Sequence, residues 1–158
     1  QLKTQASYDL LTDSQQVAFD VIRDEFRFPE VVNLTGLPGS GKTFLAWSIS
    51  RTLKKPFFPS PAIFDARVNR PTSFAIVDNV GYRERSIRNL LAIAQRKATH
   101  SLLFITRQPN ELGFHAVSLR MPMPHDFDVV YRNLSLMEYY ASPPIRDGNF
   151  WDAIHAVL

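Results

Sequence analysis

One eight-residue segment restricts the fold of this chain more than any other feature. Residues 36–43 read Gly-Leu-Pro-Gly-Ser-Gly-Lys-Thr and match the pattern G-x-x-x-x-G-K-[ST] at every fixed position. A β-rich run, Val31 to Thr35, comes directly before the segment, and Phe44 to Leu53 after it has the periodicity of a helix. A strand that enters a helix through such a glycine-rich loop predicts an α/β fold.

The residue types of this loop predict what it binds. Glycines at positions 36, 39 and 41 let the backbone approach an anion closely and direct its N–H groups at it, and the following helix adds its positive end. In a site for Mg·ATP, Lys42 would reach the β- and γ-phosphates and the Thr43 hydroxyl would bind Mg²⁺. The predicted ATP-binding residues are Gly36, Leu37, Pro38, Gly39, Ser40, Gly41, Lys42 and Thr43.

A second metal-binding residue is predicted at the end of another apolar run. Phe74 to Val77 is continuously apolar, as expected for a strand covered on both faces, and Asp78 ends it. We predict that Asp78 holds Mg²⁺ together with Thr43, in the manner of a Walker B carboxylate. The turn chemistry of residues 78–81 is an alternative explanation for an aspartate here.

The residue after Asp78 bears on whether ATP is hydrolysed. It is Asn79, and an amide cannot take a proton from an attacking water. Three alternatives follow: Asn79 orients the water, a carboxylate such as Glu84 or Glu111 serves as the base, or hydrolysis is slow.

Helical and extended patterns alternate along the chain. A capping box at Thr12 to Gln15 opens an amphipathic helix within 12–28, and a helical stripe lies between Tyr82 and Ala98. Leu102 to Thr106 and Ala116 to Leu119 read as further strands. This alternation predicts a three-layer α/β/α fold with a mainly parallel sheet and right-handed crossovers.

Other segments are less regular. Four prolines interrupt Lys54 to Pro71, where we expect a short strand near Ala62 to Phe64, and Val129 to Tyr140 reads as a helix. We predict one domain over residues 1–158, with an N-terminal helix at 12–28, a nucleotide-binding core at 31–140 and a C-terminal helix at 145–158. Because the sequence begins at Gln1 and ends inside that helix, we expect a segment of a longer protein.

Composition excludes several classes of site. The chain has no cysteine, which excludes a disulfide scaffold, a cysteine zinc site and a thiol nucleophile, and its four histidines have no metal-binding spacing. No apolar run is long enough to span a bilayer, so we expect a cytoplasmic protein without membrane contact. The net charge of +3 suits contact with polyanions.

Two segments together resemble P-loop NTPases that carry an additional strand between the phosphate-loop strand and the Walker B strand, the group of the AAA+ and STAND-type ATPases. Val31 to Leu53 and Phe74 to Pro109 carry this resemblance. Leu102 to Arg107 is similar to the STAND pattern of an apolar strand that ends in Thr or Ser followed by Arg. The resemblance implies that Thr106 or Arg107 senses the γ-phosphate; a solvated Thr-Arg pair in a loop is the alternative.

The segment ahead of the loop has two interpretations. Residues 11–18 resemble the adenine-recognising segment of helicases, which implies that Gln15 contacts the base. The capping box explains Gln15 equally well.

The sequence leaves three functions open. We expect an ATP-hydrolysing switch or motor subunit of a larger, DNA-associated assembly, with Lys42, Asp78, Asn79, Thr106 and Arg107 as the catalytic residues. A small P-loop kinase that phosphorylates a nucleic acid or a metabolite is the second interpretation, and an ATP-binding scaffold with little turnover is the third. The resemblance implies an oligomer, and Arg85, Arg88 and Arg96 on one helix are the candidate contacts to nucleic acid.

Overall fold

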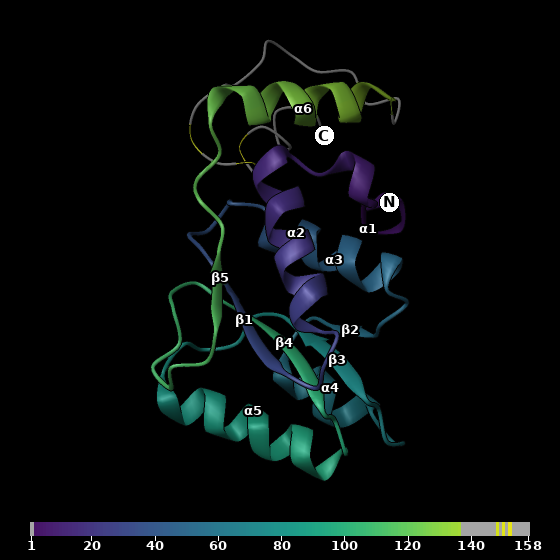
Figure 1. Cartoon of the computed structure of the whole chain (residues 1–158), viewed down its shortest axis with the longest axis vertical. Coiled ribbons are helices and arrows are strands. Elements are labelled where there is room, and N and C mark those ends of the chain that lie inside the picture. Colours follow the sequence, from purple (N-terminus) through teal and green to yellow (C-terminus); the bar gives the residue numbers. More distant parts are fainter. Residues whose placement is uncertain (1, 137–147, 149, 151, 153–158) are drawn as a thin grey trace.

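Five parallel strands form one sheet. The computed structural model describes residues 2–136 together with Gly148, Phe150 and Asp152 (Figure 1). The strands are β1 (Val31–Thr35), β2 (Phe57–Phe58), β3 (Phe74–Val77), β4 (Ser101–Thr106) and β5 (Ala116–Ser118). Every neighbouring pair is parallel, and the spatial order is β2-β3-β4-β1-β5.

Helices cover both faces of this sheet. They are α1 (Leu2–Gln5), the 3-10 helix η1 (Tyr8–Leu10), α2 (Asp13–Glu25), α3 (Lys42–Thr52), α4 (Pro61–Arg67), α5 (Glu84–Arg96) and α6 (Pro124–Leu136). Helices α2 and α3 pack on one face and α4 and α5 on the other, whereas α6 lies beyond the carboxyl ends of the strands (Figure 1). The predicted three-layer α/β/α fold is confirmed.

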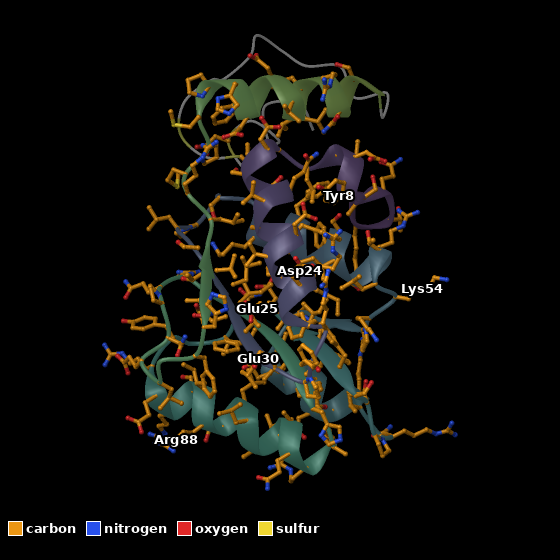
Figure 2. The ribbon with its side chains drawn as sticks, in the orientation of Figure 1. Tyr8, Asp24, Glu25, Glu30, Lys54 and Arg88 are labelled. Atoms are coloured by element: carbon orange, nitrogen blue, oxygen red, sulfur yellow. The ribbon has the colours of Figure 1, made fainter. Side chains whose placement is uncertain are left out.

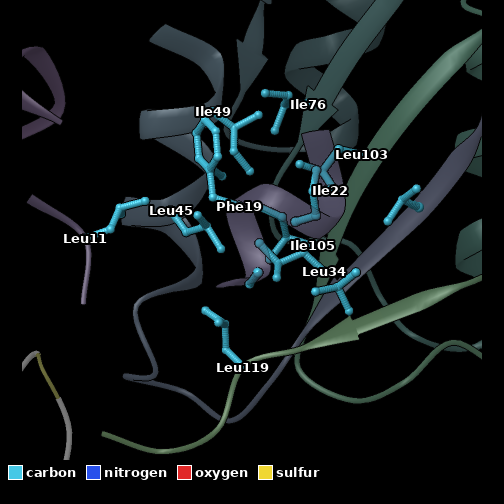
Figure 3. Packing of buried hydrophobic residues seen from close by; sticks show 14 of the residues in the cluster. Leu11, Phe19, Ile22, Leu34, Leu45, Ile49, Ile76, Leu103, Ile105 and Leu119 are labelled. Atoms are coloured by element: carbon cyan, nitrogen blue, oxygen red, sulfur yellow. The ribbon is translucent and has the colours of Figure 1, made fainter. Parts of the chain in front are cut away.

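Strand residues alternate between two apolar cores. Leu34, Ile76 and Ile105 join the core under α2 and α3, which Figure 3 shows from close by. Val77 and Phe104 join the core under α4 and α5. Successive side chains of a strand point to opposite faces, so strands buried on both faces must be apolar throughout, as β3 is.

The order of the strands confirms the additional strand that the resemblance implied. β4 lies between β1 and β3, with Leu34 opposite Ile105 and Val77 opposite Phe104. The carboxyl ends of β1 and β3 therefore face the same edge of the sheet with β4 between them. Ligands bind at this edge in open α/β sheets.

The predicted strand near Ala62 to Phe64 is wrong, because these residues lie in helix α4. Ser60 precedes the helix and accepts a hydrogen bond from the Ile63 backbone N–H at 3.3 Å, and Pro61 occupies the first helical position. Serine followed by proline is a helix start signal, and the apolar run after it concealed that signal. The strand of this region is the shorter β2.

The C-terminal predictions fall only partly within the described residues. The helix predicted at Val129 to Tyr140 begins earlier, at Pro124, and residues 137–140 lie outside the described residues. The helix predicted at 145–158 lies outside them except for Gly148, Phe150 and Asp152. The division into 12–28, 31–140 and 145–158 stays a prediction. No described helix is long and apolar enough to cross a membrane.

The backbone conformation of Ala98, directly after α5, leads to a testable prediction. Ala98 has φ of 51°, and hydrogen bonds from Ala98 N to Gln95 O and from Thr99 N to Ala94 O complete a Schellman motif, in which glycine is preferred. We expect Ala98→Gly to stabilise the fold by about 0.5–1 kcal/mol because the substitution removes the strain on Cβ. Ala92→Gly, on the exposed face of the same helix, should destabilise it by about 1 kcal/mol. Urea unfolding measures the free energy of unfolding of both variants. Equal changes in the two would contradict the Schellman motif at Ala98.

Candidate nucleotide-binding site

The glycine-rich loop connects β1 to α3 in the conformation that its glycines predict. Gly36 has φ of 152° and Gly41 has φ of 86°. A Cβ at Gly36 would lie 2.7 Å from the Leu119 carbonyl oxygen, and one at Gly41 would lie 2.3 Å from Gln15 Nε2. Gly36 therefore requires glycine for space as well as for backbone conformation, whereas at Gly41 the positive φ is the main requirement because the Gln15 side chain can move.

Lys42 closes the loop on itself. Its Nζ donates to the carbonyl oxygens of Gly36 at 2.6 Å and Leu37 at 2.7 Å. Burial lowers the pKa of Lys42 below its usual value, the charge of Asp78 acts in the opposite direction, and the charge of Arg107 lowers it further. The ammonium is thus held where phosphate groups would meet the loop, and Arg107 lies within electrostatic range of it.

Thr43 and Asp78 meet across the edge of the sheet. Thr43 Oγ1, at the start of α3, donates to Asp78 Oδ2 at 2.8 Å, and Asp78 at the end of β3 is only 6% exposed. A hydroxyl and a carboxylate oxygen are ligands that suit Mg²⁺. Among the described residues no group of three His, Cys, Asp or Glu gathers anywhere.

Asn79 has a clear structural role. It has φ of 53°, a conformation that asparagine tolerates, and its Nδ2 donates to the Pro59 carbonyl oxygen at 3.0 Å. The amide therefore ties the end of β3 to the connection before α4. The two candidate bases contact α5 instead: Glu84 pairs with Arg88 at 2.6 Å, and Glu111 accepts from the Glu84 N–H at 2.9 Å.

A buried polar network surrounds Thr106, and sequence reasoning missed its centre. Asn33 in β1 is fully buried, and its Nδ2 donates to Thr106 Oγ1 at 2.9 Å and to the Phe104 carbonyl oxygen at 3.2 Å. Asn33 Oδ1 accepts from Asn110 N at 3.1 Å and from Asn110 Nδ2 at 3.2 Å. Thr106 Oγ1 donates in turn to the Gln108 carbonyl oxygen at 2.6 Å. An asparagine inside an apolar strand was the available signal.

This network separates the two sensor candidates. The Thr106 hydroxyl donates its proton to Gln108, and Thr106 is 2% exposed. Arg107, the next residue, is exposed and influences Lys42 electrostatically. Of the two side chains, Arg107 is therefore the one free to approach a phosphate.

Gln15 lies against the loop and also caps α2. Its Oε1 accepts from the Thr12 backbone N–H at 3.0 Å, which confirms this half of the predicted capping box, and its Nε2 donates to the Gly41 carbonyl oxygen at 3.4 Å. Phe150 is a second contact that sequence reasoning missed: its N–H donates to the Gly39 carbonyl oxygen at 3.0 Å. Contact between Gln15 and a base stays a prediction.

The three arginines proposed for nucleic acid lie on the exposed side of α5. Arg88 is paired with Glu84, and Arg96 pairs with Asp65 at 3.2 Å. Arg85 is exposed. Two of the three charges are therefore partly neutralised by neighbouring carboxylates.

Comparisons with known proteins agree with this geometry. The model of the AAA family, described as the ATPase family associated with various cellular activities, matches residues 32–107. That range contains the loop, Asp78, Thr106 and Arg107. The fold is similar to AMPPCP-bound DnaA from Aquifex aeolicus, with a TM-score of 0.59 and 13% identity over 86% of this chain and 57% of that chain. The chain has the fold of a P-loop NTPase of the AAA+ type.

Two further proteins are similar to this chain, one in structure and one in sequence. The RuvB Holliday junction branch migration motor of Thermotoga maritima has a TM-score of 0.56 and 16% identity over 90% of this chain and 57% of that chain. Shikimate kinase of Burkholderia pseudomallei (strain 1710b) is 34% identical over 74 residues. That alignment covers 45% of this chain, and this chain spans 40% of the length of the kinase.

Proposed function

We propose that this AAA+ domain binds Mg·ATP at the loop 36–43 and hydrolyses it as the switch or motor part of a larger assembly that acts on DNA. The hydrogen bond of 2.8 Å between Thr43 and Asp78 carries the proposal. It joins the loop to the end of β3 at the edge of the sheet where α/β folds bind ligands. The DnaA and RuvB neighbours, which share the fold, support the DNA-associated part of the proposal.

The residues of the site divide the work of phosphoryl transfer. The loop N–H groups cradle the phosphates, and Lys42 moves from the loop carbonyls to the β- and γ-phosphates. Thr43 and Asp78 would hold Mg²⁺, which when bound neutralises charge on the phosphate oxygens. Arg107 contacts the γ-phosphate and reports its loss to the segment 107–115. Thr106 and Arg107 at the end of β4 are also the residues that resemble the STAND pattern.

Asn79, which stands where a carboxylate would activate the attacking water, determines how fast this reaction runs. Asn79 keeps one hydrogen bond to Pro59 and can only orient a water. Slow turnover in the isolated chain is the expected consequence, with faster turnover when a neighbouring subunit completes the site. We therefore propose a homo- or hetero-oligomer as the working form.

Phosphate release by the wild-type chain, measured with and without double-stranded DNA, tests the proposed function. Mg²⁺-dependent release that rises with DNA supports it. ATP binding without any release, under all of these conditions, contradicts hydrolysis and favours an ATP-binding scaffold.

A small P-loop kinase is the second candidate function, because the chain is 34% identical to shikimate kinase over 74 residues. The same assay with shikimate as the acceptor distinguishes it. ADP formation that requires the acceptor would favour the kinase, whereas acceptor-independent phosphate release favours the ATPase.

The Thr43 hydroxyl provides a prediction about the metal. We expect Thr43→Val to raise the Mg²⁺ concentration for half-maximal turnover by about tenfold or more, since it removes one metal ligand and the partner of Asp78. Thr43→Ser keeps the hydroxyl and should stay close to wild type. Titration of turnover with Mg²⁺ measures both, and an unchanged Mg²⁺ requirement in Thr43→Val would exclude Thr43 as a ligand.

A further inference from the structure

We propose that a basic surface at the C-terminal end of α3 binds the backbone of single-stranded nucleic acid. We call it the α3-end surface, and its members are Lys3, Arg51, Lys54 and Lys55. The 11 residues of α3 place it about 16 Å from the nucleotide loop, at 1.5 Å of rise per residue. The surface is therefore separate from the ATP site.

The charge of this surface is uncompensated. Neither residues 1–8 nor residues 31–64 contain a single Asp or Glu. Within the part of the chain that the structure describes, no carboxylate pairs with any of the four cations, in contrast to Arg88 and Arg96 on α5. Cations that no described carboxylate pairs with attract a polyanion at long range.

The end of α3 keeps these cations close together. Lys54 N donates to the Arg51 carbonyl oxygen at 3.3 Å, and Lys55 N donates to the Ser50 carbonyl oxygen at 2.8 Å. This Schellman motif reverses the chain directly after the helix, so the backbone of Lys54 and Lys55 stays beside Arg51, and Lys55 Nζ lies 5.6 Å from the centre of the Phe74 ring. Figure 2 shows Lys54 projecting away from the body of the molecule, far from Arg88 on α5.

An open hollow adjoins Arg51. It has a volume of about 490 Å³, and the N-terminal segment forms its other wall. Hydroxyl and guanidinium groups are donors for phosphate oxygens. The lining residues are Thr4, Gln5, Ala6, Ser7, Arg51 and Thr52.

Aromatic rings favour nucleic acid over an acidic protein as the partner. Lys3 Nζ lies 5.1 Å from the centre of the Phe57 ring, and the rings of Phe57 and Trp47 are 6.2 Å apart at 70°. Trp47 and Phe57 are both partly exposed beside the cations. Basic side chains that alternate with aromatic rings are typical of single-strand binding, because unstacked bases pack on the rings while phosphates pair with the cations.

The role of this surface in an ATP-driven assembly rests on the proposed function. The binding of single-stranded nucleic acid does not, because it needs no ATP. The test therefore uses the full chain without ATP and a fluorescein-labelled oligothymidylate of about 16 nucleotides, followed by fluorescence anisotropy. One variant carries Arg51→Gln, Lys54→Gln and Lys55→Gln. A second variant carries Arg85→Gln, Arg88→Gln and Arg96→Gln; it loses the same number of charges from α5, the other candidate surface for nucleic acid, and so compares the two surfaces directly. Circular dichroism confirms that both variants are folded.

We expect the α3-end variant to bind the oligonucleotide at least about tenfold more weakly than wild type, and its salt slope to fall by about 2, since each contact contributes about 0.7 on a single strand. The α5 variant should stay closer to wild type, because Arg88 and Arg96 are paired with carboxylates. Equal weakening in the two variants would overturn the proposal, as would absence of wild-type binding or equally tight binding to duplex DNA or polyglutamate. Because no ATP is present, failure of ATP hydrolysis leaves this result unaffected.

Discussion

Lys42→Met should reduce ATP turnover by at least about a hundredfold, which corresponds to about 2.7 kcal/mol of lost transition-state stabilisation. Methionine fills a similar volume but cannot donate to phosphate. Lys42 Nζ donates to two loop carbonyls, so the side chain is held at the loop and exchanges these partners for phosphate oxygens when ATP binds. A donor fixed at the site stabilises the charge that develops on the phosphate in the transition state.

Steady-state phosphate release and ATP binding by calorimetry measure this effect. Lys97→Met is the control, because Lys97 lies at the end of α5 and contacts the Asp65 backbone instead of the loop. Turnover should fall in Lys42→Met alone. Unchanged turnover in that variant would contradict the assignment of Lys42 to the phosphates.

Lys42 should also make ATP affinity and the free energy of unfolding depend on pH in the alkaline range. Burial lowers the pKa of Lys42, so its ammonium loses a proton at a lower pH than a free lysine does. ATP affinity should therefore fall as the pH rises through this lowered pKa. Between that pH and the usual value for lysine the unfolded chain binds more protons than the folded protein, so this group makes the free energy of unfolding rise with pH. Both dependences should be absent in Lys42→Met.

Asn33→Leu is expected to destabilise the fold by about 3 kcal/mol and to lower kcat by about tenfold or more, with a smaller effect on KM. Leucine has nearly the same size but removes the acceptor of the Asn110 backbone N–H and one of the two acceptors of Asn110 Nδ2, which keeps its bond to the Phe114 carbonyl oxygen. It also removes the donor to Thr106, directly before Arg107. Asn33 is a positioning residue in this account, since it acts on the γ-phosphate only through Arg107.

A neighbouring residue separates loss of stability from loss of position. Val32→Ala removes a fully buried side chain from the same strand, on the face of the sheet opposite to Asn33, and should cost about 2 kcal/mol. Its kcat should stay near wild type below its melting temperature. If Val32→Ala lowers kcat as much as Asn33→Leu does, the network has no specific part in turnover.

Local signals in the sequence were sufficient for much of this protein. The loop 36–43 specifies its own conformation, because a strand, three glycines and a helix start follow one another within a few residues. The limits of β3 were predicted correctly, since a strand buried on both faces is continuously apolar and ends at a charged residue. The capping contact between Thr12 and Gln15 spans one helical turn and is visible in the sequence for the same reason.

Contacts between distant segments were decided only by the tertiary structure. The position of β4 between β1 and β3 determines that Thr43 meets Asp78, and that Asn33 meets Thr106 across 73 positions of the chain. Strand β2 has two residues, too few for any periodicity to be seen. The α3-end surface likewise forms because the N-terminal segment packs beside α3. Apolar patterns report which face of an element is buried, whereas the partner of each buried polar group depends on how the whole sheet is assembled.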